Sequence, residues 1–182
     1  RAFRNLHTEK QLVIVGDAPY SEKYKAHLRS LAGPGVIFTG YAFGDEYAQL
    51  SSHAYVFVLP SAIEGTRPVL LDQMGFGNGI LACKSPANLE VVGEAGAFFN
   101  GQLGETALAE TLQDLLDHPD QVAEMRSKVA KRIREFYNWV WITDFYEDLF
   151  SRILSRQSLM QYDEYLQQRG NPTDVKNTVE KQ

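Results

Sequence analysis

The segment from Pro60 to Asp72, PSAIEGTRPVLLD, combines two carboxylates, a guanidinium group, a glycine and a helix-start signal. Thr66 is a good N-cap, and Pro68 suits the first turn of a helix, where a missing N–H costs nothing. Gly65 lets the backbone approach a ligand closely, and the free N–H groups of a helix start suit a phosphate. The guanidinium group of Arg67 can donate two charged hydrogen bonds to the oxygen atoms of the same phosphate. The segment therefore predicts an anion site.

Two carboxylates flank this predicted anion site. Glu64 lies just before it, free to accept hydrogen bonds from hydroxyl groups, and Asp72 lies one or two turns into the helix. A nucleotide-sugar carries phosphate groups between two units that bear hydroxyl groups. An anion site between two hydroxyl-binding carboxylates therefore fits a nucleotide-sugar. In the alternative interpretation both acids are solvated surface groups, and Arg67 pairs with Asp72 on one helix face.

Composition narrows the class of protein. The chain has 182 residues, 44% of them apolar, and a formal net charge of −5, which argues against nucleic acid as the main partner. A single cysteine, Cys83, cannot form an intramolecular disulfide, so a reducing compartment is expected. No apolar run approaches the roughly 20 residues of a membrane span. The four histidines show no metal-ligand spacing and no Asp-x-Asp pair occurs, so no metal is expected.

Short apolar runs alternate with segments of helical pattern along the first hundred residues. The runs at 12–15, 36–39, 55–59 and 79–83 are closed by Gly or Pro or followed by polar residues, as is typical of parallel strands buried on both faces. Helices are expected at 21–31, 45–52 and 68–74, and residues 1–9 resemble the end of a helix. This alternation predicts an α/β fold with a doubly wound parallel sheet and right-handed crossovers.

The remainder of the chain is expected to be helical. Stripes of Leu, Ile, Val and aromatic residues between 104 and 154 predict three amphipathic helices that cover the sheet. Beyond Leu154 the composition shifts to Gln, Arg, Ser and Asn. We therefore expect one domain over residues 1–154 and a flexible or partly helical tail over 155–182. Because Arg1 falls in what resembles the middle of a helix, the chain is expected to be a fragment.

At the 60–72 segment the sequence resembles the carboxyl-terminal, donor-binding domain of the retaining group 1 glycosyltransferases (family 4), which have the two-domain GT-B fold. The family pattern has Glu-Gly-Phe-Gly, a Leu-Leu pair and a second Glu separated from the first by seven residues, and this chain reads EGTRPVLLD. The resemblance extends through LVIVGDAPY, VIFTGY, AYVFVLPS and GNGILACKSPANLEVV, and through YNWVWITDFYEDLF near the end. It implies that residues 1–154 are a Rossmann-like nucleotide-sugar-binding domain that lacks its first elements.

The resemblance also implies roles for individual residues. Glu64 would contact the hydroxyls of the donor sugar as the catalytic candidate, and Asp72 would contact the ribose hydroxyls. The other implied contacts are Gly65, Thr66 and Arg67 with the sugar or diphosphate, Tyr41 and Ala42 with the base, and Gly16 at the border of the cleft. Departures from the family pattern are Asp72 in place of Glu, Thr66-Arg67-Pro68 in place of Phe-Gly and a hydrophobic residue, and Gly79 in place of Pro.

The implied function is the transfer of a hexosyl or deoxyhexosyl group from a nucleotide-sugar to a glycan or lipid, with retention and without metal or cofactor. The parent enzyme would be cytoplasmic and bacterial, act in polysaccharide biosynthesis, and touch the inner membrane face only through its other domain. That amino-terminal acceptor domain is the expected partner, and the fragment alone is expected to be inactive. The alternatives are one half of a nucleotide-sugar epimerase, and a degenerate, non-catalytic α/β binding module.

Overall fold

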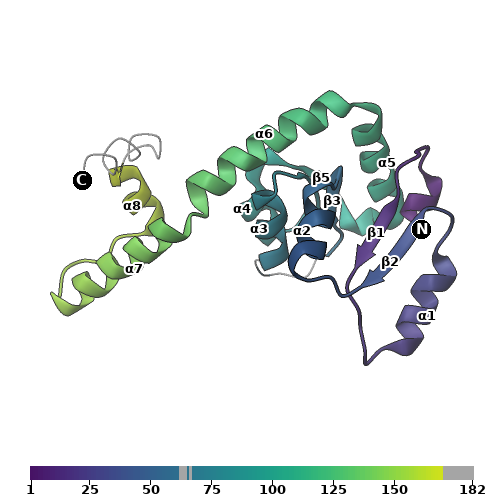
Figure 1. The fold of residues 1–182 in the computed structure, drawn as a ribbon. Helices are drawn as coiled ribbons and strands as arrows, with labels where there is room; N and C mark the ends of the chain where they lie inside the picture. Colours follow the sequence, from purple (N-terminus) through teal and green to yellow (C-terminus); the bar gives the residue numbers. More distant parts are fainter. Residues whose placement is uncertain (62–64, 66, 170–182) are drawn as a thin grey trace. The chain divides into compact units, whose positions relative to one another are not determined.

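The fold is an α/β arrangement of parallel strands and helices, seen in a computed structural model that describes residues 1–61, 65 and 67–169 (Figure 1). The chain forms two compact units, Arg1–Lys131 and Arg132–Gln182. The strands are β1 (Leu12–Val15), β2 (Val36–Gly40), β3 (Val56–Leu59), β4 (Gly79–Cys83) and β5 (Ala97–Phe99). The α-helices are α1 (Glu22–Leu31), α2 (Gly44–Ser52), α3 (Pro68–Gly75), α4 (Pro86–Val92), α5 (Gly104–Asp117), α6 (Pro119–Phe136), α7 (Trp139–Leu154) and α8 (Tyr162–Arg169).

The described strands form two parallel sheets. One pairs β1 with β2, with Val13 opposite Ile37, and the other has the order β3-β4-β5, with Phe57 opposite Ile80. The α/β class with parallel strands is therefore confirmed, although the single sheet expected from the sequence is divided into two. Within each sheet the named strands are parallel and joined through helices, as alternating apolar runs and amphipathic segments require.

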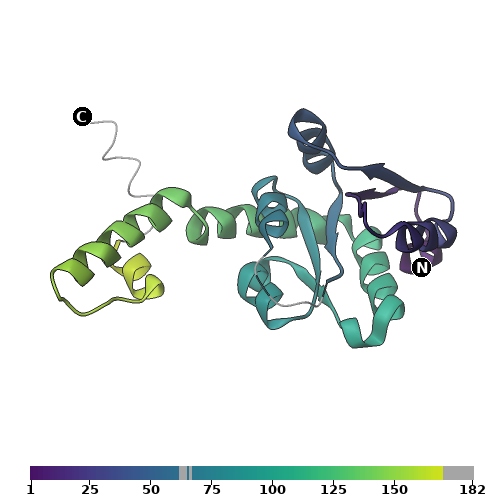
Figure 2. The same cartoon turned by 90° about the horizontal axis from the view of Figure 1, so that it is seen from below.

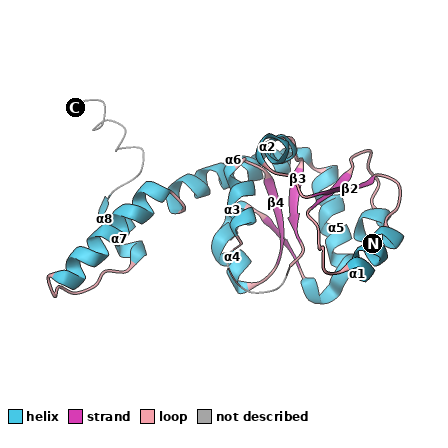
Figure 3. Ribbon diagram, turned by 60° about the horizontal axis from the view of Figure 1, so that its bottom comes forward, coloured by secondary structure: helices cyan, strands magenta, loops and turns pink. Residues whose placement is uncertain are grey.

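The core of the first unit surrounds β4. All five residues of β4 are buried, and Leu70 and Met74 of α3 and the Val91-Val92 pair of α4 are buried with them. Figure 3 shows β3 and β4 among the helices α2, α3, α4 and α5. The strand lies at the centre because it has a strand neighbour on each edge and apolar helix faces around it.

Gly79 has a specific packing role at the start of β4. A Cβ built on it would lie 3.2 Å from Val122 Cγ1 and 3.5 Å from Met125 Sδ, both on α6. Met125 also accepts a hydrogen bond from the backbone N–H of Ile80 at 3.0 Å. Glycine therefore allows α6 to approach the sheet more closely than a larger residue would, which gives a physical reason for its presence where the family pattern has Pro.

The amino-terminal segment is not the α-helix end that the sequence suggested. Residues Ala2–Asn5 form a 3₁₀ helix, and the chain then runs into an extended conformation at Leu6. The backbone N–H of His7 donates to Gln113 Oε1 of α5 at 2.8 Å, and the N-terminus lies beside α5 in Figure 2. Ala2 is the buried residue of this 3₁₀ helix.

The second unit contains the end of α6 together with α7 and α8. Phe145 of α7 packs edge-on against two rings of α8, Tyr162 and Tyr165, with centroids 5.0 and 5.3 Å away. No residue of α7 is buried, and Trp139 and Leu154 are strongly exposed. The expectation that this helix covers the sheet stays a prediction.

Candidate functional site

The carboxyl ends of β1 and β2 bring together three of the predicted site residues. The N–H of Gly16, directly after β1, donates to the carbonyl oxygen of Gly40, the last residue of β2, at 2.6 Å. Gly16 has φ +124°, and the two strands therefore end side by side. Tyr41 and Ala42 follow directly; the ring of Tyr41 is exposed and stacks on Phe43 with centroids 5.9 Å apart, whereas Ala42 is buried. Gly16, Tyr41 and Ala42 thus lie at the sheet edge where α/β folds bind ligands.

A small charged cluster lies beside Gly16. Lys25 Nζ of α1 lies 3.0 Å from Asp17 Oδ1 and 2.6 Å from Glu22 Oε1. The hydrogen bond from Lys25, followed by the one from the Ala18 N–H, lowers the pKa of Asp17. Glu22 first and then Asp17 raise the pKa of Lys25. Asp17 is therefore held ionised at neutral pH, and Lys25 is engaged by both acids.

The loop that carries most of the predicted anion site is described only in part. Glu64 and Thr66 lie outside the described residues, so their predicted contacts stay predictions. Gly65 is exposed with φ +115°, a backbone conformation that glycine adopts without strain. The N-cap of α3 is Arg67, so the prediction of Thr66 as N-cap is wrong: Pro68 takes the first helical position and leaves the cap to the residue before it.

Arg67 ties the two ends of this loop together. Its Nη2 donates to Ser61 Oγ at 2.9 Å, and the side chain is half-buried. Within the described residues Arg67 forms no ion pair with Asp72, so the pairing considered from the sequence does not occur. The guanidinium group keeps further N–H donors, because one hydrogen bond uses one of five.

Asn88 is a structural residue beside the site, and its hydrogen bonds could not be read from the sequence. Its buried amide donates to Cys83 O at 2.8 Å and to Ser61 O at 3.3 Å, so it joins the end of β4 to the start of the loop after β3. Ser85 is the N-cap of α4, the helix that contains Asn88, and its hydroxyl oxygen accepts a hydrogen bond from the Asn88 N–H at 3.3 Å. Cys83 is buried, as expected for an inert thiol.

Asp72 lies on α3 with its carboxylate exposed to solvent. Tyr47 of α2 donates from its hydroxyl group to Asp72 Oδ2 at 3.4 Å. Behind Tyr47 are three buried polar residues, Ser51, Gln73 and Asn78. The structure thus joins Asp72 to α2, the helix that follows Tyr41 and Ala42 along the chain.

Tyr47, Gln73 and Asn78 were missed by reasoning from the sequence. The two amides did leave a signal, because they interrupt an otherwise apolar stretch that leads into a buried strand, and buried amides need partners. Tyr47 left none: it stands 25 residues from Asp72 on another helix, and its contact depends on how α2 and α3 pack.

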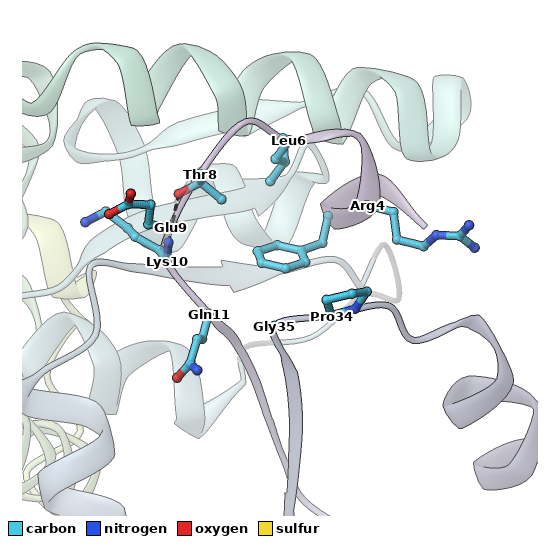
Figure 4. Close-up of a pocket in the computed structure, with 9 residues that line it drawn as sticks. Arg4, Leu6, Thr8, Glu9, Lys10, Gln11, Pro34 and Gly35 are labelled. Carbon is cyan, nitrogen blue, oxygen red and sulfur yellow. Dashed lines mark hydrogen bonds between the residues drawn. The ribbon is translucent and has the colours of Figure 1, made fainter.

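A cavity of about 380 Å³ lies at the opposite ends of β1 and β2 (Figure 4). Its walls come from the segment before β1, including Thr8 and Gln11, and from Pro34 and Gly35 before β2. Open parallel sheets bind ligands at the carboxyl ends of their strands, whereas this cavity lies at the amino ends of β1 and β2. It is therefore distinct from the site around Asp72.

The site has no cluster of metal ligands in the part of the chain that the structure describes. There, no three His, Cys, Asp or Glu side chains are grouped to hold a metal ion. Among those same residues, no helix has the length and apolar character needed to cross a membrane.

Comparison with known proteins connects this geometry to a family. The family profile described as "Glycosyl transferases group 1" matches residues 1–118. The chain belongs to the group 1 glycosyltransferases. A relative is the sulfoquinovosyl transferase SQD2 of Arabidopsis thaliana, 29% identical over 136 residues that make up 72% of this chain and 26% of the relative. The chain therefore spans about a quarter of the length of that relative.

Solved structures show the same fold. Sucrose-phosphate synthase from Thermosynechococcus elongatus matches with a TM-score of 0.69 and 24% identity, over 81% of this chain and 39% of that one. Anabaena Alr3699/HepE in complex with UDP matches with a TM-score of 0.74 and 19% identity, over 82% of this chain and 43% of that one. Its complex with UDP-glucose gives 0.72 and 20% over the same shares. These structural relatives have the GT-B fold, and the expected α/β class is confirmed.

Proposed function

We propose that the chain is the donor-binding domain of a glycosyltransferase that moves a sugar from a nucleotide-sugar to a glycan or lipid acceptor with retention of configuration. The observation that carries the proposal is the EGTRPVLLD segment at the carboxyl end of β3, in a chain whose first 118 residues match the group 1 family. The HepE structures, which contain UDP and UDP-glucose, support a nucleotide-sugar as the donor.

Each site residue has a proposed task. Asp72 accepts hydrogen bonds from the ribose hydroxyls, and Glu64 contacts the hydroxyls of the donor sugar. The backbones of Gly65, Thr66 and Arg67 face the sugar or diphosphate. The exposed ring of Tyr41, with Ala42, lies beside the base, and Gly16 borders the same cleft. Carboxylates suit the hydroxyl contacts because an ionised carboxylate accepts hydrogen bonds and the hydroxyl donates.

The proposed mechanism needs the charge of the departing nucleoside diphosphate to be neutralised. The start of α3 contributes the positive end of the helix dipole, and Arg67 adds a cation that its hydrogen bond to Ser61 holds at the loop. Donor binding and transfer then proceed without metal or cofactor. A chelator test follows: excess EDTA should leave sugar transfer unchanged, and a loss restored by Mg²⁺ or Mn²⁺ would contradict the metal-independent mechanism.

We infer that the acceptor is bound by a second, amino-terminal domain of the same polypeptide. The chain covers 26% of the sulfoquinovosyl transferase and 39–43% of the solved relatives, which leaves room for such a domain. The complete protein is then a cytoplasmic enzyme of polysaccharide biosynthesis that reaches the inner membrane face through that domain, while this chain alone binds donor without turnover.

Turnover by the complete protein tests this function. Incubated with UDP-, GDP- and dTDP-sugars and candidate acceptors, it should release nucleoside diphosphate and form a glycoside of the donor's anomeric configuration, read by NMR. Glu64→Ala should abolish most turnover, whereas Glu110→Ala, an exposed change on α5, should not. A product of inverted configuration would contradict the retaining mechanism.

The same assay separates the two alternatives. An epimerase half interconverts nucleotide-sugars without any acceptor, so a new nucleotide-sugar in the absence of acceptor would replace our proposal. A degenerate module binds donor without turnover, and Glu64→Ala would then change nothing. The substitutions at Asp72 and at Thr66-Arg67-Pro68 are the features that favour this second alternative.

A further inference from the structure

The hydrogen bond between Tyr47 and Asp72 is the exposed end of a chain of polar groups that begins in the core. Asn78 is 1% exposed, and Gln73 and Ser51 are each 4% exposed. Asn78 Nδ2 donates to Ser51 O at 2.8 Å and to Gln73 Oε1 at 2.7 Å. Gln73 Nε2 donates to Ser51 Oγ at 2.8 Å and to Tyr47 Oη at 3.1 Å.

The direction of every hydrogen bond in this chain of polar groups is fixed at its buried end. A backbone carbonyl accepts and never donates, so Ser51 O sets the orientation of the Asn78 amide. That amide uses its second N–H on Gln73 Oε1, which turns the Nε2 of Gln73 toward Tyr47. The Tyr47 oxygen thus accepts from Gln73, and its single proton is directed to Asp72.

The Tyr47 ring is also held in place. It makes an edge-on contact with Phe76, with centroids 6.1 Å apart, and the residue is half-buried between α2 and α3. The hydroxyl donor therefore occupies a fixed point beside the exposed carboxylate of Asp72. The hydrogen bond from Tyr47 to this carboxylate uses Oδ2.

We propose that Tyr47 is a positioning residue for Asp72: it holds Oδ2 and so presents Oδ1 to the ribose hydroxyls of the donor. This inference rests on the proposed function, in which Asp72 binds the ribose. An aspartate has a shorter reach than the glutamate of the family pattern, and a fixed donor beside it restricts where its carboxylate lies. Preorganisation of this kind raises affinity by lowering the ordering cost of binding.

The test uses Tyr47→Phe in the complete protein, with Tyr55→Phe as the matched control. Tyr55 donates its hydroxyl to Leu115 O at 3.0 Å, at the other end of β3, so both variants lose one hydroxyl hydrogen bond. Titration calorimetry gives the affinity for UDP and GDP and for their 2′-deoxy and 3′-deoxy analogues. Thermal melts follow the stability of both variants.

Tyr47→Phe should weaken binding of the ribonucleotide by about fivefold, the order expected for the loss of one ordinary hydrogen bond. Its kcat at saturating donor should stay within about twofold of the wild type, because the change acts on ground-state and transition-state binding alike. The decisive quantity is the ratio of ribo to deoxy affinity, which should shrink toward one in Tyr47→Phe and stay at the wild-type value in Tyr55→Phe.

Three outcomes overturn the inference and are distinguishable. Unchanged affinity and an unchanged ribo-to-deoxy ratio in Tyr47→Phe, with the wild type binding UDP or GDP, would refute the positioning role alone. Absence of UDP and GDP binding by the wild type would refute the inference, and absence of dTDP binding as well would refute the proposed function with it. A lower melting temperature with an unchanged ratio also counts against it, since a purely structural role predicts that result.

Discussion

The strands β1 and β4 have similar apolar sequences and very different surroundings. β4 is buried over its whole length, with Ile80 and Leu81 at 0% exposure. In β1, half-buried and exposed residues alternate, and Val13 and Val15 are 37% and 43% exposed. β4 pairs with a strand on each side and β1 pairs with β2 alone among the described strands. An apolar run therefore specifies a strand, and its neighbours decide how deeply the strand is buried.

The difference divides the proposed donor site into two parts of unequal rigidity. Asp72 rests on α3, whose Leu70 and Met74 are buried beside β4, and on the polar chain behind Tyr47. Gly16 and Tyr41 follow the two-stranded sheet, where side chains remain accessible. Fewer buried contacts lower the free energy of local opening. We expect the base side of the site to open locally more readily than the ribose side.

The largest expected effect compares truncations in the two strands. Leu81→Ala should lower the free energy of unfolding by about 3 kcal/mol, because it leaves a cavity in a fully buried position. Val13→Ala should cost about 1 kcal/mol or less, since its side chain is already partly solvated. Urea denaturation followed by circular dichroism measures both. Equal losses in the two variants would show that the strands are equally buried in solution.

The polar core beside β4 gives the next largest effect. Asn78→Ala removes the donor to Gln73 Oε1 and Ser51 O and leaves two buried acceptors without it, at a cost of about 2 kcal/mol. Asn5→Ala changes an exposed asparagine and should be nearly neutral. The midpoint of urea unfolding should fall for Asn78→Ala and stay near the wild-type value for Asn5→Ala. A neutral Asn78→Ala would mean that water or a rearranged Gln73 replaces the missing donor.

The local parts of this architecture could be predicted from the sequence. The strands at Leu12–Val15 and Gly79–Cys83 have the predicted bounds, because an apolar run closed by turn residues or a change in polarity determines a strand locally. The exposure of Val13 and Val15 could not be predicted, since it depends on the absence of a second strand partner for β1 in the described structure.

For the candidate site, too, the positions of residues along the strands and helices could be predicted, whereas contacts between distant elements could not. The carboxyl-end positions of Gly16, Tyr41 and Ala42 follow from strand order, and the placement of Asp72 on the helix after β3 follows from the position of Pro68. The bond from Tyr47 to Asp72 joins two helices far apart in sequence, so no local pattern encodes it. The N-cap prediction of Thr66 missed Arg67 by one residue, because Pro68 takes the first helical position and the cap is the residue directly before it.

The smallest expected effect concerns pH at the base side of the site. The pKa of Asp17 is lowered by Lys25, so its stabilising contribution is fully present above the ordinary aspartate value of 3.8 and is lost as the pH falls through the lowered pKa. Asp17→Asn should therefore melt at a slightly lower temperature than the wild type at pH 7, and the gap should close in strong acid. A gap that is constant with pH would show that the ionised carboxylate is not responsible.

The pair is also expected to weaken in alkali. The pKa of Lys25 is raised above its ordinary value of 10.5, so its contribution is present below that value and is lost as the pH rises through the raised pKa. Because these groups are at the surface, added salt should reduce the gap between the wild type and Asp17→Asn at pH 7.

The affinity of the complete protein for UDP, GDP and dTDP, with and without the Asp72 carboxylate, tests the central claim most directly. The wild type should bind one of them in titration calorimetry, and Asp72→Asn should weaken that binding by about tenfold or more, because a charged hydrogen-bond acceptor is lost. Asp114→Asn, an exposed change on α5, should bind as the wild type does. Equal affinity of Asp72→Asn and the wild type, or no binding by either, would contradict the account.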